Sequence, residues 1–140
     1  MKIRRLLQFN SDQFKQIEVL MHALSSQCVL TEEILTMALQ FSQVYVAEEG
    51  DHIIGMATLC LVCTPSGRKA DIEDVVVLPE FQGKGIGKAL VRRLIEEAGK
   101  KAPIQIHLTS KPIRVAANAL YVKMGFVRKE TNVYTMQLED

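Results

Sequence analysis

The chain has little of what marks a secreted, membrane-spanning or nucleic-acid-binding protein. Its three cysteines, Cys28, Cys60 and Cys63, are an odd number and too few for the paired framework of a small secreted domain. No stretch approaches the roughly 18 consecutive apolar residues of a membrane span, and polar residues follow Leu6 and Leu7 too soon for a signal peptide. With 17 basic and 16 acidic side chains, the net charge of +1 gives no general attraction to nucleic acid or to an acidic membrane. We therefore expect a cytoplasmic protein with neither of those partners.

The proportions of apolar and charged residues are those of an ordinary globular protein. The 140 residues of the chain are 48% apolar and 24% charged, which excludes a disordered chain and favours one domain over residues 1–140. Residues 1–70 hold 6 basic and 7 acidic side chains, a net charge of −1, whereas residues 71–140 hold 11 and 9, a net charge of +2. An anion site is therefore expected in the second half of the chain.

Hydrophobic periodicity predicts a mixed α/β fold in which helices pack on a central sheet. Helical spacing of apolar residues occurs over 11–25, 31–41, 86–99 and 114–124. Strand patterns occur over 1–7, 44–48, 53–63, 70–78, 104–108 and, as one or two final strands, 126–138. The predicted order is β-α-α-β-β-β-α-β-α-β-β, with six to seven strands and about four helices. The three consecutive strands in the middle are expected to be antiparallel.

A glycine-rich segment, Gln82-Gly83-Lys84-Gly85-Ile86-Gly87-Lys88, lies between the strongest strand pattern and the strongest helix pattern. Glycines allow backbone N–H groups to approach a ligand closely, and the positive end of the following helix dipole points at the same place. Lys84 and Lys88 add full positive charge. The segment therefore predicts a cradle for a pyrophosphate, against the alternative of a turn that only joins strand to helix.

Two well-known phosphate-binding motifs do not fit this segment. A P-loop requires glycine where Gln82 stands and serine or threonine where Ala89 follows Lys88. The dinucleotide fingerprint G-x-G-x-x-G would place its last glycine at Lys88 or Leu90, depending on where it begins. The cradle is therefore of another kind.

The pattern Gln82-x-x-Gly85-x-Gly87 resembles the acetyl-CoA signature of the GNAT superfamily of N-acyltransferases. Ile72–Val77 upstream and Ala117–Phe126 downstream also resemble the family, and so does the predicted element order. The resemblance covers nearly the whole chain and is strongest over 70–127. It implies a GNAT-like fold and an N-acetyltransferase that moves an acetyl group from acetyl-CoA to a primary amine in a ternary complex, without a metal.

The resemblance also implies roles for individual residues. The backbone of the Val75–Val77 stretch would pair with the pantetheine arm of the cofactor, and the amides of Gly83–Lys88 would hold its pyrophosphate. Asn118 falls where the family contacts the cofactor arm, and Tyr121 falls where it keeps a general acid. The cofactor-binding residues expected on this basis are Val75, Val76, Val77, Gln82, Gly83, Lys84, Gly85, Ile86, Gly87, Lys88, Asn118 and Tyr121.

Acetyl transfer to an amine also needs a base, because an alkylammonium with a pKa of about 10.4 is protonated at neutral pH. Glu73 is the first candidate and Asp74 the second. Strand alternation puts these two side chains on opposite faces unless a bulge intervenes. A solvated strand residue is the alternative interpretation of Glu73, and a packed core side chain is the alternative for Tyr121.

The acceptor is less well defined. A strand that begins Glu73-Asp74 resembles small-molecule acetyltransferases such as the aminosugar-phosphate and polyamine enzymes, which favours a small-molecule amine. The alternatives are a protein N-terminal or lysine acetyltransferase and a non-catalytic acyl-CoA-binding module. Thr131–Tyr134 either lines the acceptor pocket, contributes to a homodimer contact or is a polar turn. Cys60-x-x-Cys63 lacks a second ligand pair, so no metal site is expected.

Overall fold

The computed structural model describes all 140 residues, Met1–Asp140. Backbone contacts divide them into two compact units, Met1–Leu108 and Thr109–Asp140, which are described separately. The expectation of a single domain over 1–140 stays a prediction.

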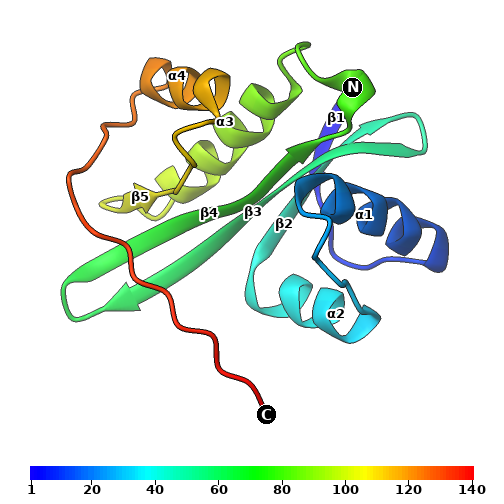
Figure 1. The fold of residues 1–140 in the computed structure, drawn as a ribbon, viewed down its shortest axis with the longest axis horizontal. Coiled ribbons are helices and arrows are strands. Elements are labelled where there is room, and N and C mark those ends of the chain that lie inside the picture. The colour runs from blue at the N-terminus through cyan, green and yellow to red at the C-terminus, as the bar shows by residue number, and fades with distance from the viewer. The chain divides into compact units, whose positions relative to one another are not determined.

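The first unit is built on a five-stranded sheet in the order β1-β2-β3-β4-β5 (Figure 1). The first four strands form antiparallel pairs, as the sequence predicts for the middle three, and β5 runs parallel to β4. The sheet is therefore mixed. Its strands are β1 (Lys2–Arg5), β2 (Gln43–Glu49), β3 (His52–Thr64), β4 (Gly67–Val77) and β5 (Gln105–His107).

Helices cover both faces of this sheet, with α1 (Ser11–Leu24) and α2 (Glu32–Phe41) on one face and α3 (Ile86–Gly99) on the other (Figure 1). A short 3-10 helix, η1 (Pro79–Phe81), joins β4 to the segment before α3. None of these helices has the length and apolar content needed to cross a bilayer. The core is apolar, and its fully buried large side chains are Leu6, Ile17, Leu20, Val46, Ile53, Ile54, Leu59, Leu90, Val91 and Leu94.

Close packing of α3 on the sheet depends on Gly55 in β3. A Cβ atom at this position would lie 3.1 Å from Leu90 Cδ1 and 3.3 Å from Ile86 Cγ2, which is tighter than ordinary van der Waals contact. The absence of a side chain lets the first turns of α3 approach the backbone of β3. This contact fixes where the N-terminus of α3 stands above the sheet.

The second unit contains one helix, α4 (Val115–Lys123), whose end the sequence predicts correctly. Gly125 has a φ of +103°, and Phe126 N–H donates to the Tyr121 carbonyl while Gly125 N–H donates to the Val122 carbonyl. These bonds form a Schellman motif, in which the left-handed glycine satisfies the last carbonyls of the helix.

The predicted final strands over 126–138 are wrong, and the sheet has five strands rather than six to seven. A strand requires ladder hydrogen bonds and a face to bury. Residues 127–140 make no backbone–backbone hydrogen bonds, and their large apolar side chains are 68–88% exposed. The alternating pattern therefore has no partner strand. Thr131–Tyr134 lies in this segment, where Asn132 Nδ2 donates to the Tyr134 hydroxyl over 3.4 Å.

Candidate functional site

A bulge interrupts β4 at the two candidate bases. Met56 pairs with Val76 and Thr58 with Glu73, so Asp74 and Val75 together stand opposite the single residue Ala57. Asp74 has a φ of +52°, in the left-handed region that aspartate tolerates better than most residues. A bulge breaks the two-residue alternation of a strand. This bulge is the exception under which Glu73 and Asp74 need not point to opposite faces.

Beyond the bulge, β4 has an open edge. Its pairing with β5 is limited to Lys69–Asp71, opposite Gln105–His107, whereas its pairing with β3 continues to Val77. From Ile72 to Val77, one side of the β4 backbone therefore has no neighbouring strand. Unpaired N–H and C=O groups on such an edge can pair with an extended ligand. This edge contains the predicted Val75–Val77 stretch.

A side-chain hydrogen bond from Gln82 connects the loop after β4 to the end of that strand. The Gln82 side-chain Nε2 donates to the Val77 carbonyl over 3.0 Å, five residues back along the chain. Leu78 N–H donates to the Ile54 carbonyl over 2.9 Å, which holds the same turn to β3. In this structure the Gln82 side chain therefore shapes the loop; contact with a cofactor stays a prediction.

The glycine segment folds as an open loop before α3. Gly83 and Gly85 have φ values of +79° and +81°, and no atom lies within 4 Å of a Cβ built on either residue. Backbone conformation, and not lack of space, is therefore the reason for glycine at these two positions. Gly85 is the N-cap of α3, and no side chain caps the helix.

This loop leaves backbone amides free at the positive end of α3. Ala89 N–H donates to the Gly85 carbonyl over 3.0 Å, whereas the N–H groups of Ile86, Gly87 and Lys88 precede the first helical hydrogen bond. The side chain of Ile86 is buried in the core and anchors this turn. Three adjacent orphan amides and the helix dipole make a site suited to a phosphate group.

The two lysines of the loop are arranged differently. Lys84 Nζ lies 5.1 Å from the centre of the Phe81 ring, a cation–π contact, and Phe81 packs edge-on against His52 with 6.3 Å between ring centres. Lys88 is exposed, and neither lysine belongs to an ion pair. The contacts of Lys84 with Phe81, and of Phe81 with His52, are not predicted from the sequence. The hairpin that contains His52 is distant in the chain from the glycine segment.

The surroundings of the two candidate bases, Glu73 and Asp74, favour their protonated, uncharged forms. Glu73 and Asp74 are both exposed, and partial desolvation raises the pKa of Glu73, with the nearby carboxylates of Asp74 and Asp71 raising it further. Partial desolvation also raises the pKa of Asp74. Neither side chain is in an ion pair. A carboxylate with a raised pKa holds a proton more strongly and is a better base near neutral pH.

Asn118 and Tyr121 lie three residues apart on α4, in the second unit. Asn118 Nδ2 donates to the Lys111 carbonyl over 3.0 Å, and the Tyr121 ring packs edge-on against Phe126 with 6.0 Å between ring centres. Burial raises the pKa of the Tyr121 hydroxyl, an effect that the positive charge of Arg114 opposes. The hydroxyl is therefore protonated at neutral pH and can act as a donor. Nearby, the buried Ser110 Oγ has no hydrogen-bond partner.

The structure thus gathers most of the predicted residues along one stretch of the first unit, from the bulge of β4 to the first turn of α3. The assignment of Asn118 and Tyr121 to the same site stays a prediction. No group of three or more histidine, cysteine or acidic side chains is arranged to hold a metal ion. The three cysteines are free, and Cys60 Sγ lies 3.5 Å from Ser42 Oγ.

The chain is similar in sequence to known acetyltransferases. N-acetyltransferase 8F1 of Rattus norvegicus is 33% identical over 94 residues, which are 66% of this chain and 42% of that protein. Glucosamine 6-phosphate N-acetyltransferase 1 of Oryza sativa subsp. japonica is 34% identical over 67 residues, 48% of this chain and 39% of that protein. The chain thus spans about two fifths of the length of these relatives.

Similarity of fold extends further than similarity of sequence. The crystal structure of an aminoglycoside acetyltransferase from an uncultured soil sample superposes with a TM-score of 0.82, covering 99% of this chain and 96% of that one, at 22% identity. That likeness shows the fold alone. Residues 40–128, more than half of the chain, match the family described as "Acetyltransferase (GNAT) domain". The chain therefore belongs to the GNAT family of acetyltransferases.

Proposed function

We propose that this chain is an N-acetyltransferase that transfers the acetyl group of acetyl-CoA to a primary amine by direct attack in a ternary complex. One observation supports this most strongly. The open edge of β4 continues, through the turn held by Gln82, directly into the uncapped N-terminus of α3. An extended arm that ends in a pyrophosphate would therefore meet unpaired backbone groups first and free amides next.

The residues present fit such a substrate. Acetyl-CoA supplies the acetyl group as a thioester. The backbone of Val75–Val77 would pair with its pantetheine arm, and the amides of Ile86, Gly87 and Lys88 would bind its pyrophosphate. Lys84 and Lys88 add the charge that a diphosphate requires. We assign Asn118 to the cofactor arm because of its place in the family motif.

The proposed reaction also requires two proton transfers, which we assign to side chains. Glu73, or Asp74 as second choice, would take a proton from the ammonium group of the acceptor, directly or through water. Tyr121 would give its phenolic proton to the departing thiolate, whose conjugate thiol has a pKa of about 8.5. The raised pKa values of Glu73 and Tyr121 suit these opposite roles, since one group must accept a proton and the other must hold one.

The acceptor we favour is a small-molecule amine. The carboxylates of Glu73 and Asp74 lie next to each other at the bulge and would attract a cationic amine. A relative that is 34% identical over 67 residues is a glucosamine 6-phosphate N-acetyltransferase, whose named substrate is a small aminosugar.

The direct test is binding and turnover with the full chain. Acetyl-CoA should bind, as measured by calorimetry, and free thiol should appear with at least one member of a panel of small amines. The Tyr121→Phe variant should lose about a hundredfold in turnover, the range of one general acid, with the acetyl-CoA dissociation constant unchanged. Failure to bind acetyl-CoA contradicts the proposal. Tight binding with no turnover on amines or peptides would instead indicate an acyl-CoA-binding module.

A further inference from the structure

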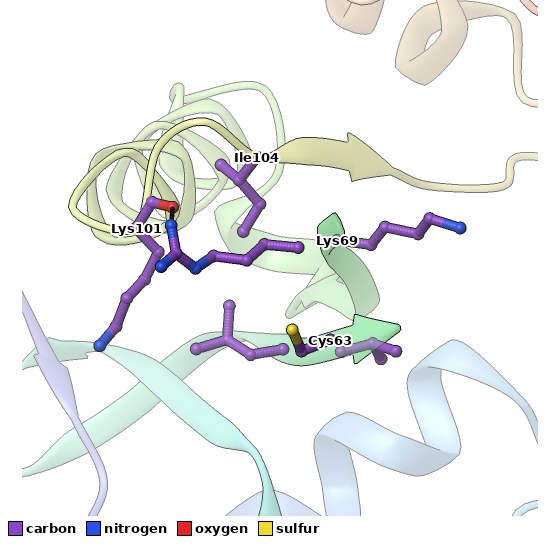
Figure 2. A pocket seen from close by; sticks show the side chains of 7 residues that line it. Cys63, Lys69, Lys101 and Ile104 are labelled. Carbon is purple, nitrogen blue, oxygen red and sulfur yellow. Dashed lines mark hydrogen bonds between the residues drawn. The ribbon is translucent and has the colours of Figure 1, made fainter. Parts of the chain in front are cut away.

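The first unit has a concave feature at the opposite end of α3 from the glycine segment (Figure 2). It is a cavity of about 150 Å³ between the end of the β3–β4 hairpin and the loop from α3 to β5. Leu61, Cys63, Arg68 and Ile104 are among the residues that line it. Lys69 lies four residues before Glu73 on β4, about 13 Å away along the strand. The cavity is therefore separate from the bulge and the glycine segment.

The interior of this cavity is apolar, although it opens to solvent. Leu61 is 39% exposed, in contrast to Leu59 at 0% two residues earlier on the same strand and the same face. Ile104 closes the cavity from the other side (Figure 2). Apolar side chains that line a concave surface mark a place where the apolar part of a ligand can be removed from water.

Two cationic side chains, Arg68 and Lys101, stand at the rim of the cavity, whereas the side chain of Lys69 points away from them (Figure 2). No acidic residue lines the cavity. Neither Arg68 nor Lys101 belongs to any of the ion pairs in the protein. Arg68 is held in place because one guanidinium N–H donates to the Lys101 carbonyl over 3.2 Å (Figure 2). A guanidinium has five N–H donors, so the others remain free to bind a carboxylate.

We propose that this cavity binds a small organic carboxylate whose apolar body enters between Leu61 and Ile104 while its carboxylate meets Arg68 and Lys101. The volume sets the size of the ligand, since a cavity of about 150 Å³ holds a molecule the size of benzene. The two cations at the rim favour an anionic ligand, because an anion would supply the counter-charge that Arg68 and Lys101 lack. This site does not depend on the proposed acetyl transfer.

Cys63 provides a reporter, because its thiol is exposed and lines the cavity. Benzoate is the probe, and benzamide, of the same shape but neutral, is its control. In the full chain, the rate of Cys63 alkylation by iodoacetamide is measured by peptide mass spectrometry, with Cys28 as the internal reference. At ten times the half-saturating benzoate concentration, the Cys63 rate should fall about tenfold while the Cys28 rate stays constant. Benzamide, or chloride at equal ionic strength, should protect far less.

Variants identify the cations involved. The single variants Arg68→Gln and Lys101→Gln should each weaken the benzoate protection, whereas Lys15→Gln, which removes the same single charge on α1, should retain it. Each variant is compared with and without benzoate, so a change in the intrinsic reactivity of the thiol cancels. Benzoate should also shift the methyl NMR signals of Leu61 and Ile104. Absence of both protection and shifts in the folded wild type, or equal protection by benzamide, would overturn the proposal.

Discussion

At the scale of single residues, the most informative position is Asp74, the only non-glycine residue with a left-handed backbone. Such a conformation costs about 1–2 kcal/mol for an ordinary L-residue, and strained residues gather at functional sites. It lies beside Glu73, and partial desolvation raises the pKa of both carboxyls although both side chains are exposed. Keeping two carboxylates here therefore opposes folding, which is a cost that a catalytic role would justify.

The Glu73→Gln variant tests this view through stability and turnover together. The folded-state pKa of Glu73 is raised, so its ionisation favours the unfolded chain, and stability is lost as the pH rises through that pKa. Because the side chain is exposed, the variant should melt only slightly above the wild type at pH 7, with the difference vanishing below the normal carboxyl pKa of about 4.3. Its turnover should fall at every pH, and wild-type turnover should fall as the pH drops through the Glu73 pKa. Thermal melts and kinetics over pH 4–9 measure both, and Glu18→Gln on α1 is the control.

The structure shows that Phe81 contacts Lys84 of the glycine segment, a role that the sequence does not predict. Its ring fixes the Lys84 ammonium, so Phe81→Leu should release that charge and weaken acetyl-CoA binding. An exposed cation–π contact is worth about 0.5–1 kcal/mol, which corresponds to about a two- to fivefold loss of affinity. Calorimetry on Phe81→Leu, Lys84→Met and the double variant measures the coupling. If the two effects simply add, Phe81 does not position Lys84.

At the scale of elements, the loop before α3 was predictable from the sequence, whereas the bulge and the C-terminal segment were not. Glycine is needed wherever φ is near +80°, so Gly83 and Gly85 encode their own conformation locally. The bulge at Asp74 arises from pairing with β3. An apolar run such as 75–77 is compatible with a regular strand and with a bulged one, so its sequence does not indicate the bulge. The alternation over 126–138 is real, but strand formation also requires a partner, which the sequence pattern does not contain.

The two glycines at the start of α3 allow a matched test of this local encoding. Gly85→Ala places a Cβ on a backbone with φ of +81°, and should destabilise the fold by about 1–2 kcal/mol. Gly87→Ala stands inside the helix, where its Cβ would lie 3.8 Å from Val77 Cγ2, an ordinary contact. It should be neutral or stabilising by up to about 1 kcal/mol. Urea unfolding of both variants measures the difference; equal destabilisation would mean that crowding, and not backbone conformation, explains the glycines.

At the scale of the whole molecule, the predicted site residues are divided between the two units. The bulge, the open edge of β4 and the glycine segment belong to the first unit, whereas Asn118 and Tyr121 belong to the second. The proposed mechanism requires both. A ligand that binds only the folded state raises stability by about 2.7 kcal/mol at a hundred times its dissociation constant, and the amides that it contacts exchange more slowly.

Hydrogen exchange with acetyl-CoA therefore distinguishes the two parts of the assignment. Slower exchange is expected at the amides of Val75–Val77 and Ile86–Lys88, because these would bind the cofactor directly. If Asn118 and Tyr121 share the site, amides of Val115–Lys123 should also exchange more slowly, and Asn118→Ala should weaken binding. Protection confined to residues 1–108 would mean that α4 takes no part, so that the general acid must be sought elsewhere while the phosphate site stands. Protection of α4 alone would contradict the phosphate site itself.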